Sequence, residues 1–294
     1  MHSKKAKQRG FLLFCVLPSL ILYLYFMVYP SISVFINSVY SWSGLSAEKT
    51  FVGMRNFQTL FQDERFWTAF KNTIFLMIFV TIFTMILSLF LAYTLSRTKL
   101  KEKNIYRTLF FFPNVLSVVV IGVLFKQIYT PKTGILDAGL EKIGLSSLTH
   151  AWLGEPETVL WALGIAMIWQ AFGYYMVMYL AGMDSISPDL YEVADLEGAS
   201  KLYQFFHVTL PLMWEIVRVT LVFFIITNIN MSFLFVDVMT DGAPNGRSEV
   251  LLSYMYRQAF TNSNFGYAMA VAVMIFLFSF ALALIINRLT QRKD

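Results

Sequence analysis

The chain has 294 residues, of which 57% are hydrophobic and only 14% charged, and its mean hydropathy is +0.60. This composition argues against an ordinary water-soluble domain, and runs of about 20 apolar residues predict membrane-spanning helices. The net charge is +5, but no basic patch lies on a soluble face, so we expect no nucleic acid among the partners. The single cysteine, Cys15, excludes a disulfide framework and a cysteine metal site.

The first third of the chain predicts two membrane helices joined by a long loop. Residues 1–10 form a basic tail, and the apolar run that follows predicts a first transmembrane helix within 11–36, ending near Pro30. A secretory signal peptide is the alternative, but the run is long for one and no A-x-A cleavage site follows it. Residues 37–71 are polar and aromatic, which predicts an extracytoplasmic loop with interfacial helices before a second helix over about 72–96.

The rest of the chain predicts four further transmembrane helices. A third begins near Thr108 and has Pro113 close to its start, and it is followed by a mixed loop over 130–157. Another loop, over 237–265, precedes the last helix. The four predicted helices lie at about 108–129, 158–182, 215–236 and 266–287. We therefore expect an all-α polytopic membrane protein with six transmembrane helices, of which helices 2–6 form a core over 72–290.

The distribution of basic residues predicts the orientation of the chain. Six crossings place both termini on one side, which holds thirteen of the 23 Lys and Arg residues, including a cluster at 97–107. Nine others lie in the longer loops opposite, and Arg218 lies at the boundary. The positive-inside rule predicts that both termini and the polar segment 184–211 are cytoplasmic. We expect a multi-pass protein of the cell (cytoplasmic) membrane, with the 97–107 cluster also contacting lipid headgroups.

The longest polar segment with internal order runs from Ser187 to Pro211. Ser187 is a predicted N-cap, and Pro188 suits the first helical position. Gly198 can adopt positive φ and end this helix, after which Ser200 can cap a second short helix. Pro211 disfavours helical conformation in the residue before it and is expected to stop the segment. By itself this pattern also fits a surface helix-turn-helix connector.

This segment resembles the cytoplasmic signature of the permease subunits of binding-protein-dependent ABC importers. The signature reads E-A-A, three residues, G, nine residues, I-x-L-P, and here it is E-V-A, D-L-E, G, nine residues, V-T-L-P. Val193 and Val208 keep small or apolar side chains at the two positions that differ. The resemblance implies a cytoplasmic coupling helix, between transmembrane helices 4 and 5, that docks in a groove of an ATPase subunit. The residues implied for ATPase coupling are Glu192, Val193, Ala194, Gly198, Ala199, Leu210 and Pro211.

Four further stretches resemble the carbohydrate-uptake branch of the same family, of the maltose and multiple-sugar permease type. They cover 53–73, 112–137, 169–194 and 239–260. The last resembles a loop usually written L-T-x-G-G-P, in which Ala243 replaces the second glycine. This branch implies a heterodimer with a second homologous permease subunit, an ABC ATPase dimer, an extracytoplasmic solute-binding protein and a carbohydrate substrate.

The outer loop over 237–265 holds the candidate contacts to the binding protein. They are Asp241, Gly242, Pro244 and Arg247, with a gate as a second possible role. A solvated glycine-proline turn is the plainer interpretation of the same residues.

The chain carries no visible catalytic chemistry. The phosphate-binding pattern G-x-x-x-x-G-K-[ST] is absent, so ATP hydrolysis is expected on a separate partner and the chain is expected not to be an enzyme. His2, His150 and His207 lie far apart, and we expect no metal and no cofactor. The apolar cores of the predicted helices contain no Asp, Glu, Lys, Arg or His. Ion-coupled carriers usually keep such residues in the membrane, so this absence favours energy supplied from outside the bilayer.

Neutral polar and aromatic residues within the helices are the candidates for a substrate pathway. They are Trp169, Gln170, Tyr174 and Tyr175 on the fourth helix and Asn228 and Asn230 on the fifth. Amides that hydrogen-bond beside aromatic faces suit a sugar, whereas hydrogen bonding between helices is the alternative role. Asn228 and Asn230 are two residues apart and cannot share a helix face. At most one of them is expected to line a pathway unless the helix is broken there.

The favoured hypothesis is therefore an ATP-driven importer subunit that translocates a carbohydrate, an oligosaccharide by preference. A non-sugar solute such as a polyol phosphate is an alternative within the same family. A membrane scaffold or receptor that docks a soluble signalling partner without transport is an alternative from another class. An ion-driven carrier is the weakest hypothesis because the cores of the helices lack Asp, Glu, Lys, Arg and His.

Overall fold

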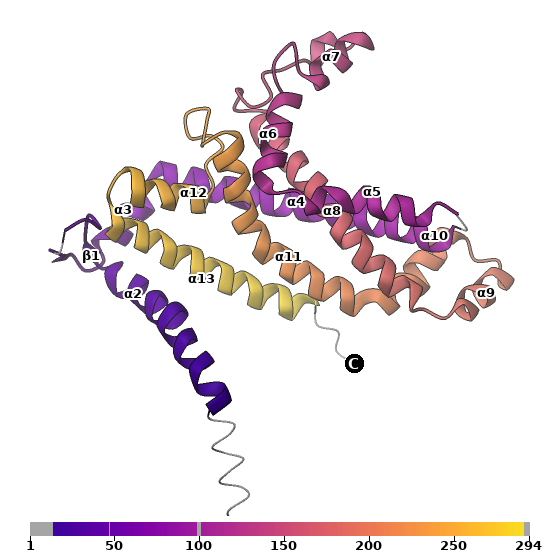
Figure 1. Ribbon diagram of the computed structural model, residues 1–294, viewed down its shortest axis with the longest axis horizontal. Helices are drawn as coiled ribbons and strands as arrows, with labels where there is room; N and C mark the ends of the chain where they lie inside the picture. The colour runs from indigo at the N-terminus through magenta and orange to yellow at the C-terminus, as the bar shows by residue number, and fades with distance from the viewer. Residues whose placement is uncertain (1–13, 47, 99–100, 291–294) are drawn as a thin grey trace, which may run out of the picture. The chain divides into compact units, whose positions relative to one another are not determined.

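The computed structural model describes residues 14–46, 48–98 and 101–290 of the chain (Figure 1). The predicted basic tail 1–10 lies outside these residues. Within them, five helices are long and apolar enough to cross a membrane, or six if a bent pair of helices is counted as one span. This number agrees with the predicted polytopic all-α fold. The chain divides into two compact units, Met1–Asp63 with Met255–Phe278 and Glu64–Tyr254 with Ser279–Asp294.

The first unit begins with the helix Phe14–Asn37, which contains the π turn η1 (Leu24–Val28) and α2 (Tyr29–Asn37). The helix therefore passes through Pro30, where the sequence predicted its end. The remaining elements of this unit are β1 (Tyr40–Ser41), β2 (Thr50–Phe51), α3 (Arg55–Gln62), the π turn η4 (Arg257–Thr261) and the first part of α13 (Phe265–Thr290).

A two-stranded antiparallel ribbon is the first unit's departure from the predicted all-α fold. Tyr40 pairs with Phe51 across the ribbon. The start of α13 closes against this ribbon, since the Gly266 backbone N–H donates to the Trp42 carbonyl at 3.1 Å. A Cβ on Gly266 would clash with the Tyr40 carbonyl, so glycine permits this close approach.

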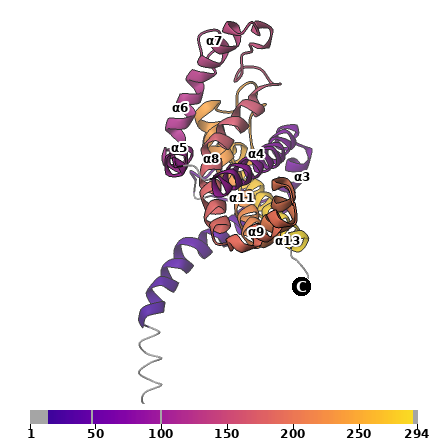
Figure 2. The same ribbon diagram turned by 90° about the vertical axis from the view of Figure 1, so that its right-hand side faces the viewer.

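The second unit is built on α4 (Glu64–Arg97), α8 (Val159–Asp184) and α11 (Leu210–Met239), and α8 lies along α4 (Figures 1 and 2). α4 begins at Glu64, so the predicted outer loop ends at residue 63 rather than 71. The Tyr179 hydroxyl joins all three helices, at 2.7 Å from Thr220 Oγ1 of α11 and 2.9 Å from Met85 Sδ of α4. Small residues allow close packing here, as is common between membrane helices, and a Cβ on Gly173 of α8 would clash with the Phe110 carbonyl.

The predicted third helix is two helices, which is a correction to the sequence analysis. α5 (Lys103–Val115) and α6 (Val118–Ile128) meet at 99°. Pro113 lacks the N–H that its turn of α5 requires. Leu116 and Ser117 then adopt extended conformations, and Ser117 Oγ accepts the Val120 N–H at 3.3 Å to cap α6. A proline followed by a good capping residue thus divides the apolar run.

The prediction that Pro211 stops the signature segment is wrong. α10 (Lys201–Gln204), the π turn η3 (Phe205–Thr209) and α11 form a continuous helix from Lys201 to Met239. In an α-helix, a proline ring clashes with the carbonyl four residues before it. Here the Leu210 N–H reaches back five residues to the Phe205 carbonyl. The widened turn therefore accommodates Pro211 without ending the helix.

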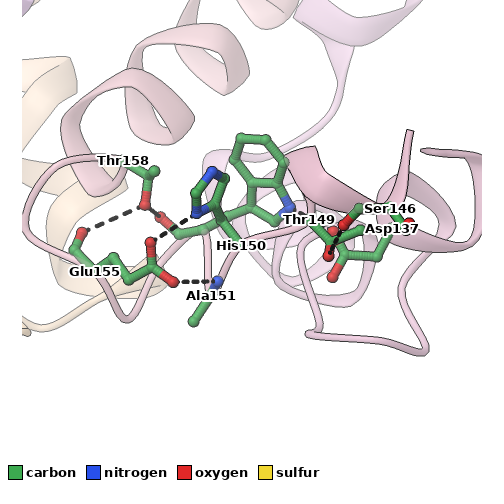
Figure 3. Close-up of polar contacts among 8 residues, drawn as sticks. Asp137, Ser146, Thr149, His150, Ala151, Glu155 and Thr158 are labelled. Atoms are coloured by element: carbon green, nitrogen blue, oxygen red, sulfur yellow. Dashed lines mark hydrogen bonds and ion pairs between the residues drawn. The ribbon is translucent and has the colours of Figure 1, made fainter. Parts of the chain in front are cut away.

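The loop over 130–157 is more ordered than the mixed loop that the sequence predicted. It contains α7 (Ile135–Lys142) and the 3-10 turn η2 (Ser146–Leu148). The buried Asp137 carboxylate accepts from the Lys132 backbone N–H at 2.9 Å and from Trp152 Nε1 at 2.7 Å. Glu155 accepts the Ala151 N–H at 2.9 Å and pairs with His150 Nδ1 at 2.9 Å (Figure 3). These bonds hold the segment as a compact cap between α6 and α8.

The loop after α11 carries a short helix, α12 (Leu251–Tyr256). Two pairs of positions before it have positive φ, first Asp241 (48°) with Gly242 (81°) and then Asn245 (50°) with Gly246 (77°). The peptide bond between Ala243 and Pro244 is cis. Such tight local turns fix the directions of neighbouring side chains.

Candidate functional site

The first helix, the glycine turn and the two serine caps predicted for the signature segment are confirmed. α9 (Pro188–Leu196) has Pro188 in its first turn, and Ser187 Oγ accepts the Asp189 N–H at 3.4 Å. Gly198 has φ +74°, which a residue with a Cβ rarely adopts. Ser200 Oγ then accepts the Tyr203 N–H at 3.2 Å and caps α10. The segment is therefore a helix, a left-handed glycine turn and a second helix.

Polar side chains lock this turn. Asp195 Oδ1 lies 2.7 Å from Lys201 Nζ and accepts from Gln204 Nε2 at 2.5 Å. The same Gln204 amide also donates to the Ala199 carbonyl at 2.9 Å, and its side chain is fully buried. The hydrogen bonds from Lys201 and Gln204 hold the pKa of the Asp195 carboxyl below its ordinary value. The turn is thus held by an ionised carboxylate.

The outer surface of α9 is exposed and largely apolar. Leu190, Val193 and Leu196, spaced at three residues, are 47%, 58% and 87% exposed. Glu192 is exposed beside them, and a Cβ on Gly198 would meet nothing within 4 Å. The three apolar side chains thus lie exposed on a short helix that also carries the acidic residues Asp189, Glu192 and Asp195.

The seven residues implied for coupling do not all lie on this surface. Ala194 and Ala199 are half-buried, and Leu210 packs against the hydrophobic core at the start of α11, next to Pro211. The structure therefore brings 192–199 together as one surface. It assigns Leu210 and Pro211 to the base of a membrane helix.

Sequence reasoning missed the residues that attach α9 to the bundle. Tyr191 is 3% exposed, and the Arg97 guanidinium carbon lies 3.7 Å from the centroid of its ring. The Tyr191 hydroxyl is 2.9 Å from Thr209 Oγ1. Nearby, the Tyr93 hydroxyl donates to the Lys201 carbonyl at 2.7 Å. The signal in the sequence is that Tyr191 is the only aromatic residue within Pro188–Leu196.

The outer loop is anchored at the opposite end of α4. Asn72 Nδ2 donates to the Arg247 and Glu249 carbonyls at 2.7 and 2.8 Å, and Thr73 Oγ1 accepts the Leu251 N–H at 2.9 Å. Nothing in the sequence alone indicates this role for Asn72 or Thr73. This anchoring leaves the Arg247 side chain exposed on a fixed backbone.

The other candidate binding-protein contacts differ in accessibility. Asp241 is exposed, Pro244 is half-buried and Gly242 is buried. A partner can therefore reach the side chains of Asp241 and Arg247, whereas Gly242 shapes the turn through its φ of +81°.

The two ends of α4 are far apart. The helical rise from Asn72 to Arg97 is about 37 Å at roughly 1.5 Å per residue. This exceeds the hydrocarbon core of a bilayer, about 30 Å. A membrane-spanning α4 therefore separates the outer loop from the α9 surface by the full bilayer.

The pathway candidates on α8 fall on different faces. Gln170 and Tyr175 are 8% and 5% exposed, whereas Tyr174 is 37% exposed. Trp169 is half-buried, with its ring centroid 5.5 Å from that of Phe125. The structure therefore does not gather these four side chains at one site.

Asn228 and Asn230 lie on opposite faces of α11, as their spacing predicts. α11 is unbroken between them, and Asn228 is 1% exposed whereas Asn230 is exposed. Within the described residues, neither Asn228 Oδ1 nor Asn228 Nδ2 has a hydrogen-bond partner. At most one of the two amides can therefore line a given surface in this conformation.

The chain is similar to known proteins over most of its length. The family model described as binding-protein-dependent transport system inner membrane component matches residues 88–294. A probable ABC transporter permease protein of Bacillus subtilis, YurN, is 36% identical over 247 residues, covering 83% of this chain and 84% of the relative. The diacetylchitobiose uptake system permease protein NgcF of Streptomyces coelicolor is 29% identical, covering 87% of this chain and 75% of the relative.

A solved structure shares the fold. It is a chain of a bacterial alginate ABC transporter, in complex with an alginate pentasaccharide-bound periplasmic protein. The TM-score is 0.86 at 25% sequence identity, and the match covers 98% of this chain and 96% of that chain.

Proposed function

The chain belongs to the family of inner-membrane components of binding-protein-dependent transport systems, and we propose that it is a permease subunit of an ABC importer for oligosaccharides. Relatives named as permeases for diacetylchitobiose, arabinooligosaccharides and lactose support a carbohydrate substrate. The complex named for alginate and a periplasmic protein supports delivery of the substrate by a solute-binding protein. The proposed assembly is this chain, a second homologous permease subunit and an ABC ATPase dimer.

One observation carries the proposal beyond family membership. A short, exposed and partly apolar helix, α9, lies at the opposite end of α4 from an anchored outer loop. This arrangement supports an assignment of two docking surfaces to opposite sides of a bilayer. We assign α9 to the ATPase and the Asp241–Arg247 loop to the binding protein. Closure of the ATPase dimer would move α9, and the bundle would respond by alternating access to the substrate.

The coupling is mechanical in this proposal. The apolar cores of the predicted spans contain no Asp, Glu, Lys, Arg or His that could carry a proton or bind an ion. The energy must therefore reach the membrane helices through contacts with the cytoplasmic segment. A nucleotide-driven partner supplies such energy without any charge movement inside the bilayer.

The exposure of each side chain distinguishes among the candidates for the substrate pathway. A sugar that moves along a surface shared with a second subunit can reach Tyr174 and Asn230 without rearrangement, because both are exposed. Gln170, Tyr175 and Asn228 are buried and do not face such a surface in this conformation. We therefore propose that Tyr174 and Asn230 contact substrate, with an aromatic face and a neutral amide suited to a sugar.

Co-purification tests the docking assignment. The chain is co-expressed with its neighbouring gene products, purified in detergent and compared with Glu192→Lys and with Glu141→Lys as a matched control. Both glutamates are exposed, but Glu141 belongs to α7. We expect an ATPase to co-purify with the unmodified chain and with Glu141→Lys but to be lost from Glu192→Lys. Equal retention by all three chains would refute the docking assignment, and a partner without ATPase activity would favour the scaffold hypothesis.

A further inference from the structure

α9 is attached to the rest of the second unit through one deeply buried side chain. All nine residues of Pro188–Leu196 are described, and Tyr191 is the one buried among them. Its ring extends away from the exposed Leu190 and Val193 side chains that form the outer surface. A displacement of α9 by a partner therefore acts on the bundle where Tyr191 is held, in addition to the Asp195 contacts with α10.

The ring of Tyr191 contacts the end of α4. The Arg97 guanidinium carbon lies 3.7 Å from the ring centroid, and Arg97 is the last residue of α4. Arg97 Nε is buried and has no hydrogen-bond partner among the described residues. The aromatic face therefore compensates part of the cost of this half-buried guanidinium, which makes the contact specific for an aromatic side chain.

The hydroxyl of Tyr191 contacts the base of α11. It lies 2.9 Å from Thr209 Oγ1, and Thr209 is fully buried as the last residue of the π turn η3. A π turn is a locally widened stretch of helix and is common at functional sites. The Gly198 turn between α9 and α10 is already held by the Asp195 contacts with Lys201 and Gln204, but these contacts do not reach η3. The bond from Tyr191 to Thr209 fixes α9 to η3 as well.

We propose that Tyr191 is the positioning residue through which movement of α9 is passed to α4 and α11 together. The Arg97 guanidinium lies over the ring of Tyr191, and Thr209 forms a hydrogen bond with its hydroxyl. This inference rests on the proposed function for the nature of the partner, but the link itself is a property of the chain. A single side chain bound to two membrane helices transmits both a push and a pull, whereas an apolar contact alone resists only a push.

A second contact supports the link without replacing it. The Tyr93 hydroxyl donates to the Lys201 carbonyl, so α4 is also joined to α10. That bond is made to a backbone atom on the far side of the Gly198 turn from α9. It can therefore hold the base of α11 against α4, but it reaches α9 only through the exposed Asp195–Lys201 pair.

The first test measures coupling in proteoliposomes that contain the full complex. Uptake is measured with radiolabelled lactose, diacetylchitobiose and an arabinooligosaccharide, alongside ATP hydrolysis. We expect Tyr191→Leu to retain the ATPase and hydrolyse ATP but to lose about fivefold or more in sugar imported per ATP, the lower range of typical coupling between sites. Tyr191→Phe keeps the ring on Arg97 and should lose less. Arg97→Lys should retain more coupling than Arg97→Met.

The matched control is Tyr203→Leu, which changes an exposed tyrosine of the same segment. It should import as much sugar per ATP as the unmodified complex. Unchanged coupling in Tyr191→Leu would overturn the proposal. So would a loss of ATPase binding as large as the loss of uptake, because Tyr191 would then act on docking alone.

The second test needs neither a sugar nor an ATPase. Amide hydrogen exchange is measured on the purified chain over α9 and over η3. If Tyr191 joins these elements, Tyr191→Leu accelerates exchange in both of them, whereas Tyr203→Leu does not accelerate it in α9. Exchange in η3 that is indifferent to Tyr191→Leu contradicts the link whatever the chain transports. Failure of the unmodified complex to bind an ATPase or import a sugar, with the exchange result intact, counts against the proposed function only.

Discussion

At the scale of single residues, a substitution at Gly198 is expected to affect both backbone strain and partner contact, and a control glycine distinguishes the two effects. Its φ is +74° and a Cβ there would meet nothing within 4 Å. Gly198→Asp should cost about 1–2 kcal/mol of local backbone strain and leave membrane insertion intact, but it should abolish ATPase docking and coupled uptake. Gly144→Asp is the matched control, because Gly144 also has positive φ (+79°) and open space but lies in the outer cap. Normal uptake by Gly198→Asp, measured together with that control, would refute the proposed docking of α9 to the ATPase.

The Asp195 carboxylate makes the order of the turn dependent on pH. Hydrogen bonds from Lys201 and Gln204 lower its folded-state pKa, so its contribution to the turn is present above the unfolded pKa of about 4. That contribution is lost as the pH falls through the lowered folded value. We expect amide exchange in α10, corrected for intrinsic rates, to accelerate below about pH 4 in the unmodified chain. Asp195→Asn should remove this pH dependence, whereas Asp189→Asn, in the first turn of α9, should preserve it.

A substitution at Asn228 tests whether its buried amide stabilises or destabilises the fold. Its two side-chain polar atoms are buried without a partner among the described residues, and such a group costs about 1–3 kcal/mol. Asn228→Leu should therefore raise the thermal unfolding temperature in detergent, whereas Asn230→Leu, at an exposed position, should leave it unchanged. If Asn228→Leu instead unfolds earlier, the amide is satisfied in the protein and belongs to the packing of the bundle.

At the scale of elements, two prolines follow π turns in the same register. Tyr29 donates to the carbonyl of Leu24, and Leu210 donates to the carbonyl of Phe205. In each case the following residue is proline, and the helix continues. The local rule that proline disfavours helix before it predicted an end at both Pro30 and Pro211. A bond that skips one residue cannot be foreseen from that rule, because the rule considers only the conformation of the residue before proline and not a widened turn.

The sequence predicted the elements whose signal is local. Length and hydropathy placed α4, α8 and α13 to within a few residues at most ends, and capping chemistry predicted α9 and the Gly198 turn. The division at Ser117 was missed because hydropathy does not change across it. Tyr191 and Arg97 were missed because they are 94 residues apart in the chain and meet only after α4 and α9 fold together.

Close packing between α8 and α5 gives a prediction at this scale. A Cβ on Gly173 would clash with the backbone carbonyl of Phe110, which cannot move as a flexible side chain can. Gly173→Ala should destabilise the chain by about 1–3 kcal/mol, as overpacking does in other cores. Gly139→Ala in α7 is the control, because its Cβ meets nothing within 4 Å and alanine favours helix. Thermal unfolding in detergent distinguishes the two, and equal midpoints would show that α5 and α8 separate easily.

At the scale of the whole molecule, orientation in the membrane decides whether the two docking surfaces face the right compartments. The positive-inside rule predicts a cytoplasmic α9, and the length of α4 then requires an external cap and outer loop. Leu196 in α9 and Ile143 beside α7 are 87% and 69% exposed, so a cysteine at either position is accessible to reagent. The chain has one natural cysteine, and Cys15→Ser provides a cysteine-free background.

A membrane-impermeant maleimide should label Ile143→Cys in intact spheroplasts and Leu196→Cys only in inside-out vesicles. Each variant is the control for the other, because reagent access must reverse between the two preparations. Labelling of both from one side would mean that α4 does not span the bilayer, and the proposed separation of the two docking surfaces would fail. A complete reversal of the pattern would place α9 outside the cell, away from ATP, and would exclude an ATPase as its partner while leaving the helical fold intact.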